Sequence, residues 1–248
     1  MAWWPTCSRS CRRCRRNSAE RAVRTGSVNV PDGLLDTAWT VFAWVVFAAT
    51  ALLAARRAPW RLLTDSARLN AFLAMIVALI LLWHLQAGVK PGLSLHLLGA
   101  TVFTLCFGWP LAFIGLSLVL LGVTLNGAAG WQAFAVNALL MAGVGVAVSH
   151  AAHRLVDRLL PAHLFVFIFC KGFFTSALAL IAVGLASSLV FAVAGTYPGQ
   201  YLMDEYLPYF FLLGFSEAWL SGMLSTLLAV YRPQLLADSG DALFSGRE

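Results

Sequence analysis

Two ionisable side chains stand inside long apolar stretches of the sequence, where a charge needs a partner or a function. Lys171 lies about nine residues into the stretch 163–195, and Glu217 about eleven residues into the stretch 206–231. At about 1.5 Å per helical residue, both would lie at a similar depth in a hydrocarbon core roughly 30 Å thick. We therefore expect Lys171 and Glu217 to form a structural ion pair, rather than a gate or a proton relay.

Histidines offer a second kind of chemistry, because imidazole nitrogens bind transition metals. His84 lies near the end of the second apolar stretch and His96 at the start of the third. Each also has a simpler explanation: His84, beside Trp83, fits the membrane interface, and His96 could hydrogen-bond a helix start. His150 and His153 are spaced i, i+3, and we interpret them as a solvated helix end.

Little in the sequence points to catalysis. There is no Walker A motif and no His-Glu-x-x-His motif, so any ATP hydrolysis is expected to come from partner subunits. Gly214-Phe215-Ser216 has the form of a Gly-x-Ser motif, with His150 as a distant base, which leaves an intramembrane serine protease as a remote alternative. We predict no catalytic residue and no permanently bound cofactor.

The elements that position these residues are predicted to be membrane helices. The chain has 248 residues, of which 60% are hydrophobic and 11% charged, and its mean hydropathy is +0.79. That is too little polar surface for a soluble globule of this length. The long Leu/Ala/Val/Phe runs lack the alternation of a membrane β-barrel. The predicted fold class is therefore all-α, a polytopic membrane bundle.

About seven transmembrane helices are expected from the apolar runs. The predicted spans are 35–55, 69–87, 93–108, 110–126, 131–153, 163–195 and 206–231. The third and fourth are short and are joined at Gly108-Trp109-Pro110, because proline ends one helix and starts the next. A tight helical hairpin is expected there.

The arginines between spans predict the orientation. Arg56, Arg57, Arg61 and Arg68 lie between the first two spans, Arg154 and Arg158 follow the fifth, and Arg232 follows the seventh. With seven spans all three places share one side, which the positive-inside rule assigns to the cytoplasm. The membrane domain is then expected to begin outside and to end with a cytoplasmic tail, residues 237–248.

Residues 1–27 conflict with that orientation, because they carry seven arginines and a single glutamate just ahead of the first span. Val28 offers an explanation, since a bacterial GTG codon is read as methionine when it initiates translation. We expect residues 1–27 to be a disordered basic leader or a mis-annotated start, and residues 28–236 to be the transmembrane domain.

Four stretches of that domain resemble the motifs of a known protein family and occur in the same order. They are "NVPDGLL" at 29–35, "KPGLSLHLLGA" at 90–100, "VNALLMAGVG" at 136–145, which contains Asn137, and "GFSEAWLSGMLSTLLAVYRPQLL" at 214–236. Together they resemble the CbiM/NikM family, the substrate-binding membrane components of energy-coupling factor (ECF) transporters for cobalt and nickel. The likeness covers about 28–236.

The resemblance implies a metal held by the free amino terminus, the residue after it and a histidine beside the third helix. Asn29 stands where the family has its first histidine, so the resemblance implies the amine of Val28, Asn29 and His96 as ligands. We add His84 as a candidate ligand because it is expected on the same outer side. The implied partners are a coupling transmembrane subunit and ATPase subunits in a bacterial inner membrane, with no nucleic acid. A structural or assembly protein and an ECF component for a non-metal substrate remain alternatives.

Overall fold

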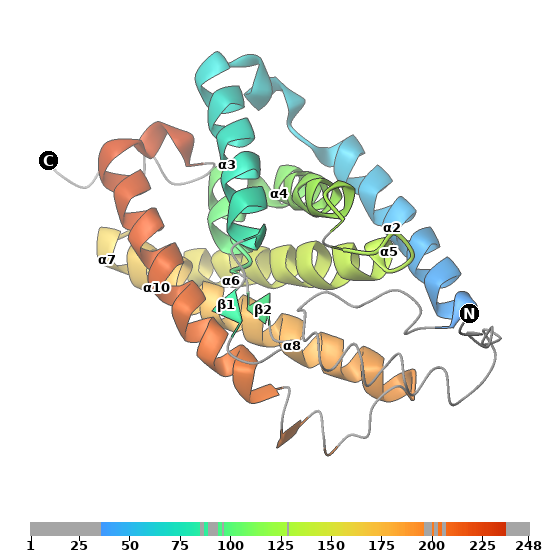
Figure 1. Ribbon diagram of the computed structural model, residues 1–248. Coiled ribbons are helices and arrows are strands. Elements are labelled where there is room, and N and C mark those ends of the chain that lie inside the picture. Colours follow the sequence, from blue (N-terminus) through green and yellow to red (C-terminus); the bar gives the residue numbers. More distant parts are fainter. Residues whose placement is uncertain are drawn as a thin grey trace, which may run out of the picture.

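The computed structural model describes residues 36–84, 87–88, 94–95, 97–127, 129–195, 200, 203–204 and 207–236 (Figure 1). Val28, Asn29 and His96 lie outside these residues, as do the basic leader and the tail 237–248. Six helices in the described part of the chain are long and apolar enough to cross a membrane. The predicted all-α membrane class is confirmed.

The helices account for nearly all of the regular structure in that part. The long ones are α2 (Thr37–Arg57), α3 (Ser66–His84), α4 (Ala100–Leu125), α6 (Gly145–Leu159), α8 (Thr175–Val193) and α10 (Leu207–Tyr231). Short pieces extend two of them: α5 (Phe134–Asn137) and the π-helical η2 (Ala138–Val144) lead into α6, while α7 (Leu164–Val166) and the π-helical η3 (Phe167–Phe174) lead into α8.

Four small elements are also described. The 3-10 helices η1 (Trp60–Thr64) and η5 (Pro233–Leu235) follow α2 and α10. Strands β1 (Ala87–Gly88) and β2 (Ser94–Leu95) pair antiparallel in the connection between α3 and α4.

The third and fourth predicted spans form one sharply bent element, α4. Gly108 breaks the helix with φ 72° and ψ 169°, a conformation that only glycine adopts readily. The limbs fold onto each other, because Gly115 packs directly against the ring of Phe103 and leaves no room for a Cβ atom. The expected turn is therefore present, but the expected count of about seven spans is not confirmed by the described residues, which hold six candidate spans. The first limb, residues 100–107, is only about 12 Å long and cannot cross the bilayer core.

Both ends of α4 lie beside the second half of α3. Gly99 packs against Leu79, and Gly122 packs against Ile80. Because α4 returns to the end of the bundle from which it began, the arginine-bearing connections still share one side, as in a seven-span arrangement. Which side faces the cytoplasm stays a prediction.

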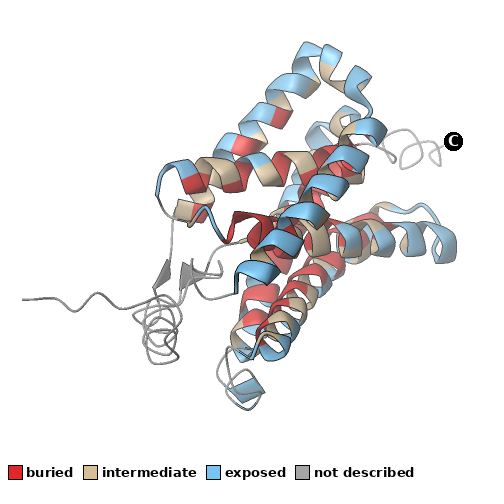
Figure 2. Ribbon diagram, turned by 90° about the vertical axis from the view of Figure 1, so that its right-hand side faces the viewer, coloured by how far each residue is buried: buried red, intermediate tan, exposed pale blue. Residues whose placement is uncertain are grey.

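The most buried of the six long helices are α4 and the helix 134–159. Buried residues are red in Figure 2 and gather in the middle of the bundle. Helix α6 lies beside α8, and α10 packs along α8 and η3 (Figure 1). Helix α2 is peripheral and buries only Ala43 and Ala54. Its outward side chains are large and apolar, as expected for a lipid-facing helix.

Candidate functional site

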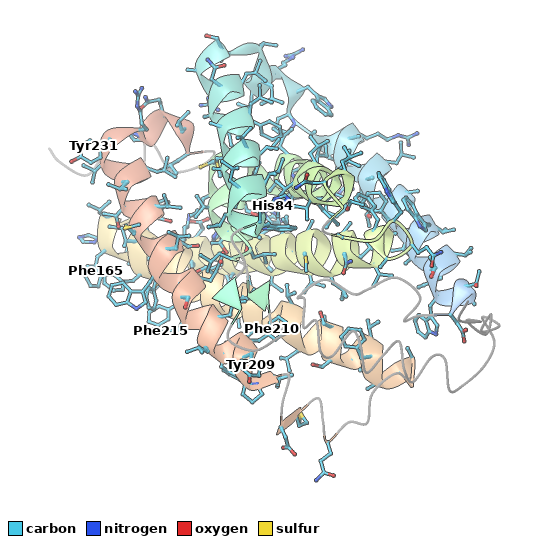
Figure 3. The ribbon with its side chains drawn as sticks, in the orientation of Figure 1. His84, Phe165, Tyr209, Phe210, Phe215 and Tyr231 are labelled. Carbon is cyan, nitrogen blue, oxygen red and sulfur yellow. The ribbon has the colours of Figure 1, made fainter. Side chains whose placement is uncertain are left out.

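His84 is the last residue of α3 (Figure 3). Hydrogen bonds fix its imidazole on both sides. Its Nδ1 lies 2.7 Å from the carbonyl oxygen of Ile80. Its Nε2 lies 2.6 Å from Nδ2 of Asn126, directly after α4. The carbonyl accepts and the amide donates, so these partners assign the Nδ1–H tautomer, with the ring's lone pair on Nε2.

This arrangement is the one that metal-binding histidines use. A donated Nδ1–H to a carbonyl orients the ring and leaves Nε2 as the metal ligand. In His84 the Asn126 amide occupies that lone pair, so a metal would have to displace a single hydrogen bond. His84 is half-buried, at the end of the bundle where α3 and α4 meet.

The described residues do not themselves complete a metal site. No group of three or more His, Cys, Asp and Glu residues able to hold a metal occurs among them. Three of the predicted ligands, Val28, Asn29 and His96, fall outside that part of the chain, and the four-ligand set stays a prediction. Asn137 is described and buried, at 1% exposure, where α5 meets the π-helical η2.

Glu217 is buried within α10, and its partner is the start of α4. Oε2 accepts a hydrogen bond of 2.8 Å from the backbone N–H of Leu98, and Oε1 one of 2.7 Å from that of Gly99. Gly99 is the N-cap of α4, with φ 70°. A carboxylate is favourable there, because the positive end of the helix dipole and two otherwise unpaired N–H groups meet it.

Lys171 has a different partner. Its Nζ forms a salt bridge with Asp157 of α6, whose side chain is 53% exposed. The predicted ion pair with Glu217 is therefore corrected. Gly172 packs against Ser225 and Gly222, which places Lys171 one to two turns past Glu217 along α10.

Lys171 and Glu217 lie at different depths because α10 is longer than the bilayer core is thick. Glu217 lies fourteen residues before the end of α10 at Tyr231, about 21 Å. Lys171 lies only seven residues after Leu164, the first residue of α7, or about 10 Å. The expected similar depth placed Glu217 by its distance from the first residue of α10, as if the length of α10 equalled the thickness of the bilayer core. The 25 residues of α10 make a helix longer than that thickness.

His153 is also not the solvated residue that the sequence predicts. It is 7% exposed, and its Nε2 lies 3.1 Å from the carbonyl oxygen of Lys171. The π-helical η3 explains this contact, because its i→i+5 pattern frees carbonyls from the helix ladder. The Thr175 hydroxyl bonds the neighbouring carbonyl of Cys170 at 2.8 Å.

The sequence reasoning missed Asp157 and the pattern to which it belongs. Gly145, Ser149, His153 and Asp157 recur every four residues on α6 and so share one face. The face contacts, in order, Leu98, Thr101 and Lys171. This i, i+4 spacing of small and polar residues is readable from sequence and would have identified Asp157 as facing the bundle.

Ser216 does not stand in a catalytic arrangement. It is exposed on α10, next to Phe215, which points away from the bundle (Figure 3). Its hydroxyl bonds the carbonyl of Leu212 on its own helix at 3.3 Å. This geometry gives the serine protease alternative no support.

Solved structures with the same fold are transition metal transporters by their titles. A truncated transition metal transporter superposes with a TM-score of 0.67 at 19% identity, covering 81% of this chain and 97% of that one. A second transition metal transporter gives a TM-score of 0.66 at 19% identity, covering 81% and 92%. Likeness at this identity establishes the fold alone. Curated protein sequences gave no match.

The family comparison covers most of the sequence. The model of CbiM, described as the cobalt uptake substrate-specific transmembrane region, matches residues 29–235. The chain therefore belongs to the CbiM family.

Proposed function

We propose that this protein is the substrate-binding membrane component of an ECF-type transporter that takes up a divalent transition metal, cobalt or nickel. The observation that carries the proposal is the family match over residues 29–235. The likeness in fold to two solved transition metal transporters supports it.

The proposed ligands are the amine of residue 28, Asn29, His84 and His96. Amine and imidazole nitrogens suit Ni(II) and Co(II). The geometry of His84 supports its place in this set, because its Nδ1 is committed to Ile80 and its Nε2 is held by one displaceable partner, Asn126. A ligand set that includes the residue 28 amine requires the working chain to begin there.

The proposed direction of transport follows the arginines. Under the positive-inside rule the connection between α2 and α3 and the ends of α6 and α10 face the cytoplasm, and His84 faces outward. The metal then enters from outside the bacterial inner membrane. A coupling transmembrane subunit and ATPase subunits supply the energy, because the sequence has no Walker A motif.

Metal binding by purified protein beginning at residue 28 tests the proposal. Ni(II), Co(II), Cu(II) and Zn(II) are titrated in detergent into wild type, His84→Ala and His96→Ala. His163→Ala is the matched control, since His163 is an exposed N-cap residue of α7. We expect wild type and the control to bind and both site variants to lose affinity. No binding of any metal by wild type overturns the proposal and favours a non-metal substrate or an assembly role.

A further inference from the structure

We propose that Glu217 is a positioning residue for the outward metal site, because its carboxylate holds the backbone that enters α4. This inference rests on the proposed function for the identity of the substrate. The anchoring itself rests on contacts among described residues.

The contact has the form of a clamp. Each carboxylate oxygen of Glu217 accepts one backbone N–H, from Leu98 and from Gly99. The two amides are consecutive, so the carboxylate fixes both the position and the direction of the chain at this point. Ser221, one turn further along α10, hydrogen-bonds the same carboxylate. Glu217 is 2% exposed, and water therefore competes little for these bonds.

Neighbouring helices close around the same segment. A Cβ at Gly99 would lie 2.5 Å from Leu79 Cδ2, and one at Gly145 would lie 2.8 Å from Leu98 Cδ2. One residue into α4, the hydroxyls of Thr101 and Ser149 lie 2.9 Å apart. The start of α4 is thus seated between α3, α6 and α10, and Glu217 supplies the charged contact.

The anchored segment lies beside the helix that ends at His84, and it follows His96 closely in the sequence. Leu79, against which Gly99 packs, precedes His84 by five residues of α3, about 7.5 Å along the axis. In the sequence His96 precedes Leu98 by two residues, at most about 7 Å of extended chain. Release of the two amides would therefore shift the α4 entry relative to His84. Loss of a direct hydrogen-bond partner of a metal ligand typically weakens metal affinity about 10–100-fold. Glu217 acts one step further away, through the backbone, and we expect a loss at the lower end of that range.

Glu217→Gln tests the role with little change in volume, since the amide keeps one acceptor oxygen and turns an NH₂ group toward the second N–H. Glu217→Asp keeps the charge on a shorter side chain and carries the test if the Gln variant does not fold. Gly172→Ala is the control: its Cβ would lie 2.9 Å from Ser225 Oγ, so it disturbs α10 packing away from α4.

Two readouts are compared in the protein beginning at residue 28. The first is amide hydrogen exchange in peptides covering residues 97–107. The second is the Kd for Ni(II) or Co(II), together with the visible absorption spectrum of the bound ion. We expect Glu217→Gln to speed exchange in 97–107, to raise Kd at least about tenfold and to alter the spectrum. Glu217→Asp should lie between Gln and wild type, and Gly172→Ala should match wild type in Kd and spectrum despite a lower Tm.

The possible failures are distinct. Wild-type exchange in 97–107 and a wild-type Kd in Glu217→Gln overturn the positioning role while leaving the proposed function intact. An equal loss of affinity in Gly172→Ala also overturns it, because general destabilisation would then explain the effect. If wild type binds no metal, the proposed function fails and exchange alone decides the anchoring: faster exchange in Glu217→Gln supports it, and unchanged exchange overturns it.

Discussion

The Nε2 atom of His84 lies 2.6 Å from the Nδ2 atom of Asn126, which ties the end of α3 to the end of α4. The ring is oriented from behind by the Ile80 carbonyl. The single lone pair of the imidazole is therefore held in place and occupied by a neutral partner that a metal ion can replace.

Asn126→Ala should strengthen metal binding. Without the amide, the metal no longer has to displace a hydrogen bond with a net value of about 0.5–1.5 kcal/mol, so Kd should fall about two- to tenfold. Titration of the purified variant measures this. Gln132→Ala removes an exposed amide six residues further along the chain and should leave Kd unchanged. A weaker Kd in Asn126→Ala would instead make Asn126 part of the binding site.

The salt bridge between Lys171 and Asp157 should be visible as a thermodynamic coupling. Removal of one partner of a buried pair costs about 3–5 kcal/mol, and the 53% exposure of Asp157 reduces this toward about 1–3 kcal/mol. Asp157→Asn should therefore lower the free energy of unfolding, and the double variant with Lys171→Met should recover much of that loss. Denaturant unfolding in detergent measures each value.

A double-mutant cycle between Lys171 and Glu217 distinguishes the Lys171–Asp157 salt bridge from the Lys171–Glu217 ion pair that the sequence predicts. Because Lys171 contacts Asp157 while Glu217 contacts the α4 entry, the losses in Lys171→Met and Glu217→Gln should add. A strong recovery in that double variant would contradict the structure.

Gly108→Ala should destabilise the protein. At φ 72° and ψ 169° an L side chain costs about 1–3 kcal/mol, and the bend of α4 depends on this conformation. A lower Tm by thermal unfolding is the expected result. Gly143→Ala is the control, since an added Cβ there meets no atom closer than 3.9 Å. Equal stability of the two variants would argue against the bend at Gly108.

Single cysteines should report the orientation. Trp131 lies just before α5 and His163 just before α7, and both side chains are exposed. A membrane-impermeant maleimide added to intact cells should label Trp131→Cys and should label His163→Cys only after lysis. The native cysteines, which are Cys7, Cys11, Cys14, Cys106 and Cys170, must first be replaced. The reverse labelling pattern would invert the proposed direction of transport.

The features that sequence predicted correctly are those set by local composition. The lengths of the apolar runs predicted the helices. Gly108 and Pro110 predicted the bend in α4, because both residue types have distinctive backbone preferences. The expected number of spans is not confirmed in the described part of the chain, since the short limb 100–107 is apolar without being long enough to cross.

Contacts between helices were less predictable. The charge of Glu217 is met by backbone N–H groups, which every residue carries, so no residue type marks the partner in the sequence. To predict the partner of Lys171, the relative depth of two helices must be known to within one turn. Counting residues from uncertain helix ends cannot reach that precision.

X-ray absorption spectroscopy of the Ni(II)- or Co(II)-loaded protein beginning at residue 28 tests the central claim most directly. The outer-shell scattering of imidazole counts histidine ligands. We expect scattering from two imidazoles in wild type, from one in His84→Ala or His96→Ala, and from two in the His163→Ala control. A wild-type spectrum without imidazole scattering, or one unchanged in both site variants, would show that His84 and His96 do not bind the metal.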